Sequence, residues 1–242
     1  MVVSEFAPRR ASGWRLLLVA VLAYALAQVA AGLVLYAFAG FPISAASLRA
    51  SVASMQSGHS IAVSSAVGEV VMPLVGWLLL RRFLRARDIR LRAPRMADIT
   101  AGVGLLLLTV VLSAVFGALL HTGDVASQVS VAGHLRSLWW EAPAIAVSAG
   151  VAEEILFRGY LLEGLLRVFR GRTWVAVPVS ALAFALAHLS WGISALQFLF
   201  YVALGVLFAL FVLRRRNLWP AIIAHAAWDG LAFLLLATRA GG

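Results

Sequence analysis

The sequence contains no cysteine and no lysine, and it is poor in charge of either sign. Without cysteine, the chain can form no disulfide, no thiolate metal site and no cysteine nucleophile. Charged residues make up 12% of the 242 residues and hydrophobic residues 63%, and the mean hydropathy is +0.96. Soluble domains are closer to half apolar. Because a soluble core cannot absorb this much apolar surface, the excess must face lipid, and the composition indicates an integral membrane protein.

Apolar runs long enough to cross a bilayer, which takes about 20 helical residues, occur seven times. The runs cover roughly residues 15–40, 60–80, 98–120, 142–166, 173–191, 194–213 and 218–238. The sequence has no clear internal repeat and no segment typical of a soluble domain. It therefore predicts an all-α, polytopic transmembrane bundle of about seven spans.

The net charge of +10 comes from twenty arginines against ten acidic residues. Most arginines gather between the apolar runs, in segments 9–15, 81–95, 167–172 and 214–216. This placement favours the orientation bias of a membrane protein over a nucleic-acid-binding surface. With seven spans all four segments fall on one side, which predicts a cytoplasmic N-terminus and an outside C-terminus in the cell membrane. The arginine-rich loop is expected to contact anionic lipid headgroups.

Ionisable residues within the predicted spans are few, and such residues are functional candidates because charge is costly in lipid. They are Glu69, Glu153, Glu154, Arg158, His188, His225 and Asp229. Six of these seven lie in the last hundred residues. This concentration predicts one shared polar site among the C-terminal helices, whereas the isolated Glu69 receives no role.

Helical spacing assigns the two adjacent glutamates to different faces. Glu154 and Arg158 are four residues apart and can form an ion pair on one face. Glu153 points about 100° away from that face at 3.6 residues per turn. The two carboxylates therefore need not perform the same task.

The fifth and seventh predicted spans each carry a second polar stripe. Phe184 shares a face with His188, and His225 shares one with Asp229. Counted from Arg172, His188 lies about 24 Å along its helix. Convergence of all the polar residues therefore requires a tilted helix, or one that starts outside the hydrocarbon.

The chemistry that these residues permit is hydrolysis by an activated water. A carboxylate in apolar surroundings is a competent general base near neutral pH, and a nearby histidine can share a proton, hold a water or donate to an oxyanion. Two carboxylates and two histidines could instead bind a divalent metal such as zinc. No HExxH string, no pair of membrane aspartates and no Gly-x-Ser-Gly-like loop is present.

The order of these motifs resembles one known family. The strings Glu153-Glu154-x-x-x-Arg158, Phe184-x-x-x-His188 and His225-x-x-x-Asp229 are similar to the three motifs of the CPBP family, also called Abi, of CAAX prenyl proteases and bacteriocin-processing enzymes. The resemblance covers roughly residues 140–235. It divides the single membrane domain into N-terminal helices in 1–140 and CPBP-like catalytic helices in 141–242.

The resemblance also implies roles for the carboxylates and histidines. Glu153 would activate a water, and His188 would help to position it. His225 and Asp229 would form the side that stabilises an oxyanion or holds water, although asparagine is common at the position of Asp229 in the family.

The remaining motif residues would support the site, and the whole would act on membrane-associated substrates. Glu154 and Arg158 would orient the site, with Phe184 as a supporting residue. The implied activity is intramembrane cleavage of peptides or proteins, with lipid as a partner and with no assignment of metal or oligomeric state. A non-catalytic scaffold or immunity protein, and a proton-coupled transporter, remain alternatives.

Overall fold

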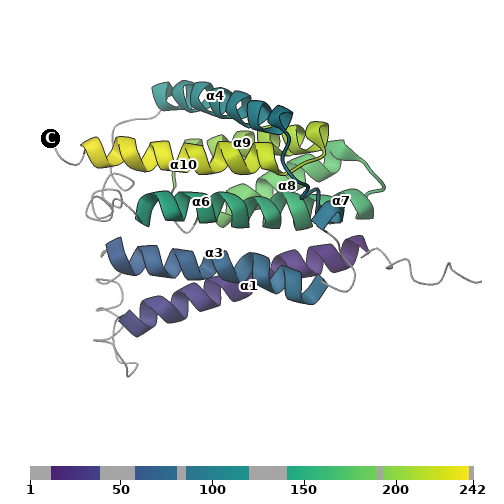
Figure 1. The fold of residues 1–242 in the computed structure, drawn as a ribbon, viewed down its shortest axis with the longest axis horizontal. Coiled ribbons are helices and arrows are strands. Elements are labelled where there is room, and N and C mark those ends of the chain that lie inside the picture. Colours follow the sequence, from purple (N-terminus) through teal and green to yellow (C-terminus); the bar gives the residue numbers. More distant parts are fainter. Residues whose placement is uncertain (1–11, 39–57, 81–85, 120–140, 190–192, 240–242) are drawn as a thin grey trace, which may run out of the picture.

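The computed structural model describes residues 12–38, 58–80, 86–119, 141–189 and 193–239, and all regular elements in these ranges are helices (Figure 1). The N-terminal helices are α1 (Gly13–Phe38), α3 (Gly58–Leu80), a short 3-10 helix η1 (Ala86–Ile89) and α4 (Met96–Leu119). The C-terminal helices are α6 (Glu141–Glu154), a π-helical segment η3 (Ile155–Leu161), α7 (Leu162–Val168), α8 (Thr173–Ala187), α9 (Ala195–Arg215) and α10 (Trp219–Arg239).

These elements confirm the predicted all-α bundle, with one helix or continuous helical run for each predicted span. Among the residues that the structure describes, three segments are long and apolar enough to cross a membrane, namely Gly13–Ala37, Met96–Leu119 and Ala195–Arg215. The chain is a multi-pass membrane protein. The count of seven spans, the orientation of the termini and the division of the chain at residue 140 stay predictions, and the arginine-bearing segments 1–11 and 81–85 lie outside the described residues.

Two of the predicted spans differ from the elements that form. The span predicted over 173–191 corresponds to α8, which ends at Ala187 after 15 residues and is therefore about 22 Å long, shorter than a hydrocarbon core of about 30 Å. The span predicted over 142–166 is interrupted by the π-helical segment. Apolar periodicity does not encode either feature.

The helices are arranged in three layers (Figure 1). α1 and α3 pack together on one side, and α4, α9 and α10 lie on the other. Between them runs α6, which contacts both α3 and α10. Apolar side chains on the outer faces remain open, with Leu18, Val29 and Val111 each 59% exposed, as expected of surfaces that face lipid.

Close packing of α6 against α10 depends on a glycine. A Cβ atom at Gly150 would lie 2.8 Å from the backbone nitrogen of Ala226. Small residues at such contacts allow membrane helices to approach closely. Gly150 precedes Glu153 by one helical turn and Ala226 follows His225, so this contact brings the two polar stretches together.

We predict that Gly150→Ala destabilises the protein by about 1–3 kcal/mol, because the added methyl group must push α6 away from α10. The measurement is thermal unfolding of the detergent-solubilised protein. Gly104→Ala is the matched control, since a Cβ atom there meets nothing within 4 Å. The control is expected to be neutral or slightly stabilising. An equal loss of stability in both variants would contradict this account of the α6–α10 contact.

Candidate active site

The polar residues of the C-terminal helices meet in the interior of the bundle. Glu153 and Glu154 end α6, His188 caps the C-terminus of α8, and His225 and Asp229 lie one turn apart on α10. Glu153 Oε2 lies 3.9 Å from His188 Nε2 and 4.0 Å from His225 Nε2, and Asp229 Oδ2 lies 3.5 Å from His225 Nε2. Three helices therefore contribute to one cluster of ionisable groups.

Glu154 is fully buried and forms two short contacts through one carboxylate oxygen. Its Oε1 accepts from Arg158 Nη1 at 2.9 Å and lies 2.9 Å from His225 Nδ1. The i,i+4 ion pair predicted from the spacing is therefore present. Glu154 thus links the helix that carries both glutamates to the helix that carries His225.

The guanidinium of Arg158 contacts two aromatic rings as well as the carboxylate of Glu154. Its guanidinium carbon lies 4.3 Å from the centroid of Phe184 and 5.5 Å from that of Phe208, and the side chain is 1% exposed. Cation–π contacts of this kind are strengthened when the cation is desolvated. Phe184 also contacts the rings of His188 and His225, so it fills the space between the three polar stripes.

Glu153 is in a different situation from its neighbour. Its Oε2 atom is buried and has no hydrogen-bond partner among the described residues, although the side chain is 22% exposed. Buried polar atoms are normally paired with protein or with ordered water. The two adjacent glutamates thus have separate surroundings: Glu154 binds Arg158 and His225 through Oε1, whereas Glu153 faces two imidazoles across a gap.

The histidine contacts define which ring nitrogen faces that gap. His188 Nδ1 lies 2.8 Å from the carbonyl oxygen of Phe184, which can only accept, so Nδ1 carries a proton. His225 Nδ1 is placed the same way against the Glu154 carboxylate. Both rings therefore present Nε2 to Glu153.

Glu153 and His188 lie at equal sequence distances from the connection between α7 and α8. Glu153 lies fifteen residues before Val168, and His188 lies fifteen residues after Thr173, on the two arms of one helical hairpin. At the start of α10, Leu218 donates its backbone N–H to Arg90 O at 2.9 Å. The predicted convergence of Glu153, His188 and His225 is therefore present.

The gap between Glu153 and the imidazoles suits a water molecule. A water with hydrogen bonds of about 2.8 Å to two atoms 4.0 Å apart spans an angle of about 90°. Ligands of a tetrahedral zinc ion, with bonds of about 2.1 Å, lie only about 3.4 Å apart. Within the described residues, no group of three or more histidine and acidic side chains has the geometry of a metal site. The side chains as placed do not fit tetrahedral zinc.

Comparison with known families connects this geometry to an activity. Residues 135–231 match the family model described as type II CAAX prenyl endopeptidase Rce1-like. This segment, called the Rce1-like segment below, is therefore similar to the type II CAAX prenyl endopeptidases. The match confirms the resemblance to the CAAX protease family and supports a membrane protease with peptide or protein substrates. No curated protein and no solved structure matches the chain.

Inside the Rce1-like segment, the helix geometry changes directly after the two glutamates. Residues Ile155–Leu161 form a π-helix, with Arg158 and five neighbours buried. Such insertions are rare and occur frequently at functional sites. The π-helical segment carries Arg158, which pairs with Glu154, and it begins directly after the residue pair from which Glu153 faces α8 and α10.

Helices outside the Rce1-like segment also reach the site, and sequence reasoning did not find this. Glu69 on α3 accepts a hydrogen bond from Ser148 and lies close enough to Glu153, Asp229 and His225 to interact electrostatically. On α1, the Tyr24 hydroxyl donates to Ala187 O at 3.4 Å. The first half of the chain therefore encloses the site, a role that its generic apolar pattern does not signal.

The α9 helix contributes an aromatic wall that sequence reasoning also missed. The Tyr201 ring stacks on His188, with centroids 4.2 Å apart and planes at 24°. It also contacts Phe184 edge-on. Tyr201 therefore fixes the plane of the His188 imidazole, and no charged or motif position marked it in advance.

We predict that Glu154→Gln destabilises the protein by about 3–5 kcal/mol, because it leaves the guanidinium of Arg158 buried without the carboxylate to which it is hydrogen-bonded. SDS-induced unfolding of the detergent-solubilised protein measures the effect. The matched control is Glu163→Gln, which removes a partly exposed carboxylate paired with Arg90 and Arg167. Its cost should stay below about 1 kcal/mol. Similar costs for the two variants would show that Glu154 does not anchor the site.

Proposed function

We propose that the protein is an intramembrane endopeptidase in which Glu153 activates a water for attack on a peptide carbonyl. The observation that carries this proposal is the buried Glu153 Oε2 atom, without a protein hydrogen bond, opposite two imidazole Nε2 atoms at 3.9 and 4.0 Å. A general base must lie within hydrogen-bond reach of the proton it removes, directly or through one water. The match to CAAX endopeptidases supports the reaction class.

The proposed water is held through both of its hydrogens. Glu153 Oε2 accepts one hydrogen, and the Nε2 lone pair of His188 accepts the other, because the proton of that ring is on Nδ1. One oxygen lone pair of the water then points toward the substrate carbonyl. During attack, Glu153 takes a proton from the water, and it later returns this proton to the departing amine.

The proposed role of His225 is to stabilise the oxyanion that forms on the substrate carbonyl. Its Nδ1 is fixed by Glu154, and its Nε2 lies beside Asp229 and Glu153. These carboxylates can balance the charge of an imidazolium whose Nε2–H donates to the developing oxyanion. Asp229 only accepts hydrogen bonds when ionised, so its proposed role is to orient His225.

Glu154 and Arg158 act in this proposal as positioning residues. The buried pair fixes the His225 ring from the side opposite to the reaction. The charge of Glu154 is paired with Arg158 and its side chain is 0% exposed, whereas the Glu153 side chain is 22% exposed, so Glu153 is the carboxylate proposed to meet the water. Proposed substrates are membrane-associated peptides or proteins, since the site lies among apolar helices.

We predict that Glu153→Gln lowers kcat by about 10²–10⁴-fold without a loss of stability, because the amide cannot accept the proton of water. The assay uses protein reconstituted in liposomes and two fluorogenic probes, a farnesylated CAAX peptide and an unprenylated transmembrane peptide. Glu163→Gln is the control and should cleave at the wild-type rate, since Glu163 pairs with arginines away from the site.

Cleavage by Glu153→Gln at the wild-type rate would overturn the proposed mechanism. Mapping the N-termini of membrane proteins from cells that produce wild type or Glu153→Gln extends the test to native substrates. Identical N-termini in the two samples would favour a non-catalytic scaffold. Glu153-dependent uptake of protons with a solute in the same liposomes would favour a transporter.

A further inference from the structure

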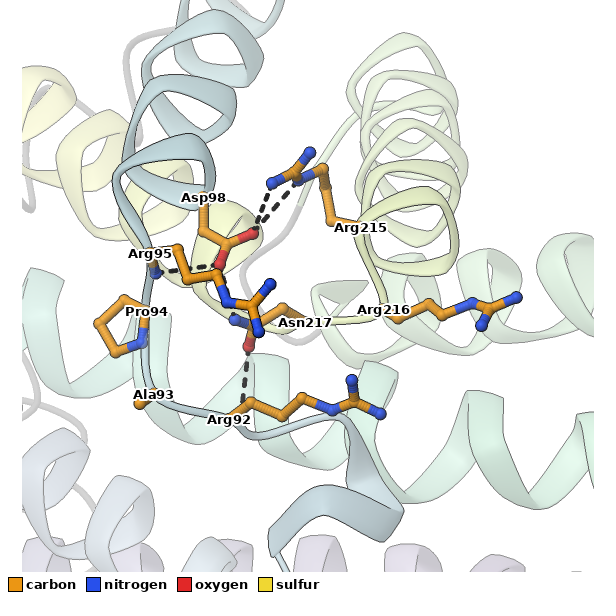
Figure 2. A pocket seen from close by; sticks show the side chains of 8 residues that line it. All are labelled: Arg92, Ala93, Pro94, Arg95, Asp98, Arg215, Arg216 and Asn217. Carbon is orange, nitrogen blue, oxygen red and sulfur yellow. Dashed lines mark hydrogen bonds and ion pairs between the residues drawn. The ribbon is translucent and has the colours of Figure 1, made fainter.

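A basic hollow of about 290 Å³ lies away from the proposed active site, between the segment that precedes α4 and the connection from α9 to α10 (Figure 2). Its lining residues are Arg92, Ala93, Pro94, Arg95, Asp98, Arg215, Arg216 and Asn217. Four of the eight are arginines, and one is acidic. The hollow therefore carries a surplus of three positive charges at its lining.

Asp98 is the organising residue of the hollow rather than part of its open surface. It is 3% exposed and accepts hydrogen bonds from the backbone N–H of Arg95 at 3.1 Å and from Asn217 Nδ2 at 3.0 Å. Its other oxygen binds Arg215 through Nε at 3.2 Å and Nη2 at 3.0 Å. The charge of Asp98 is thus neutralised by Arg215.

The two walls of the hollow are held together by the same network. Asn217 Oδ1 accepts from the backbone N–H of Arg92 at 3.4 Å, which ties the segment before α4 to the start of α10. Arg216 adopts a left-handed backbone conformation with φ of 52°, so the chain turns sharply between α9 and α10. The arginines therefore project from a backbone that is already fixed.

Three guanidinium groups remain available to a ligand. The side chains of Arg92, Arg95 and Arg216 are exposed and form no ion pair within the part of the chain that the structure describes. In Figure 2, Arg92 and Arg216 extend toward the same side. Guanidinium groups bind phosphate oxygens through paired N–H donors, so a phosphate is the anion that matches this arrangement.

The surroundings of the hollow favour a lipid as the source of such a phosphate. The hollow lies where the apolar helix α4 begins and the apolar helix α9 ends, and lipid headgroups are expected at the ends of membrane-crossing helices. Next to it on α4, Met96 is 72% exposed, Ile99 39% and Val103 49%. Acyl chains can lie along this apolar face while the headgroup phosphate enters the hollow. A free phosphate would gain nothing from the apolar face.

We propose that this hollow binds the phosphate of an anionic glycerophospholipid, with Arg92, Arg95 and Arg216 as its ligands. The proposal does not depend on the peptidase function, because none of these residues belongs to the cluster around Glu153. Arg92 and Arg95 of the arginine-rich segment would then form part of a defined lipid site, whereas the sequence alone predicts only a diffuse electrostatic contact with headgroups.

The test is native mass spectrometry of the detergent-solubilised protein titrated with phosphatidylglycerol or phosphatidylcholine. The triple variant Arg92→Gln/Arg95→Gln/Arg216→Gln should lose about 100-fold in phosphatidylglycerol affinity, or about five-fold per arginine. The matched control Arg170→Gln/Arg172→Gln/Arg214→Gln removes the same charge at exposed positions outside the hollow and should bind as wild type does. Thermal unfolding without lipid is the control that checks that both variants remain folded.

Three results would overturn the proposal. The first is an equal loss of phosphatidylglycerol binding in the control variant, which would mean that only the total charge matters. The second is equal wild-type affinity for phosphatidylcholine, which would mean that anionic lipid is not selected. The third is stabilisation of the protein by millimolar inorganic phosphate as strong as that by phosphatidylglycerol, which would identify a free phosphate as the ligand.

Discussion

The buried contact of Glu154 with Arg158 and His225 is the interaction on which the rest of the site depends. An ion pair removed from water persists only when its geometry is good and its partners are held. Here, Phe184 and Phe208 flank the guanidinium, and the shared oxygen of Glu154 joins α6 to α10. With Glu154 holding Arg158 and His225 Nδ1, the adjacent Glu153 faces the Nε2 atoms of both imidazoles.

Much of this arrangement follows from helical spacing, and the parts that do not have identifiable physical reasons. Apolar runs predicted the helices, and the four-residue separation of Glu154 and Arg158 predicted their pair. The π-helix does not follow from periodicity, because it is stabilised by the packing of its buried residues. The stacking of Tyr201 on His188 is a contact between α9 and the end of α8, and no local sequence pattern specifies such a contact. The same holds for the approach of α1 and α3 to the site.

The sequence pattern of the arginines likewise predicts only part of what these side chains do. Their gathering between apolar runs predicted a basic membrane face, yet it did not separate structural arginines from available ones. Arg90 binds Glu163 through its side chain and Leu218 through its carbonyl, so it anchors the start of α10. Arg215 neutralises Asp98. Arg90 therefore anchors the residue that directly precedes α10. Because His225 lies about two turns into α10, the arginine network and the site share this helix.

The central claim is that Glu153 and His188 hold a water, with His225 beside it, rather than bond to one another. An experimental structure at a resolution that shows ordered solvent tests this claim most directly. The account predicts a water within about 3 Å of Glu153 Oε2 and of at least one histidine Nε2. Density for a metal ion bound by these three side chains, or a direct hydrogen bond from Glu153 to a protein group with no water beside it, would contradict the account.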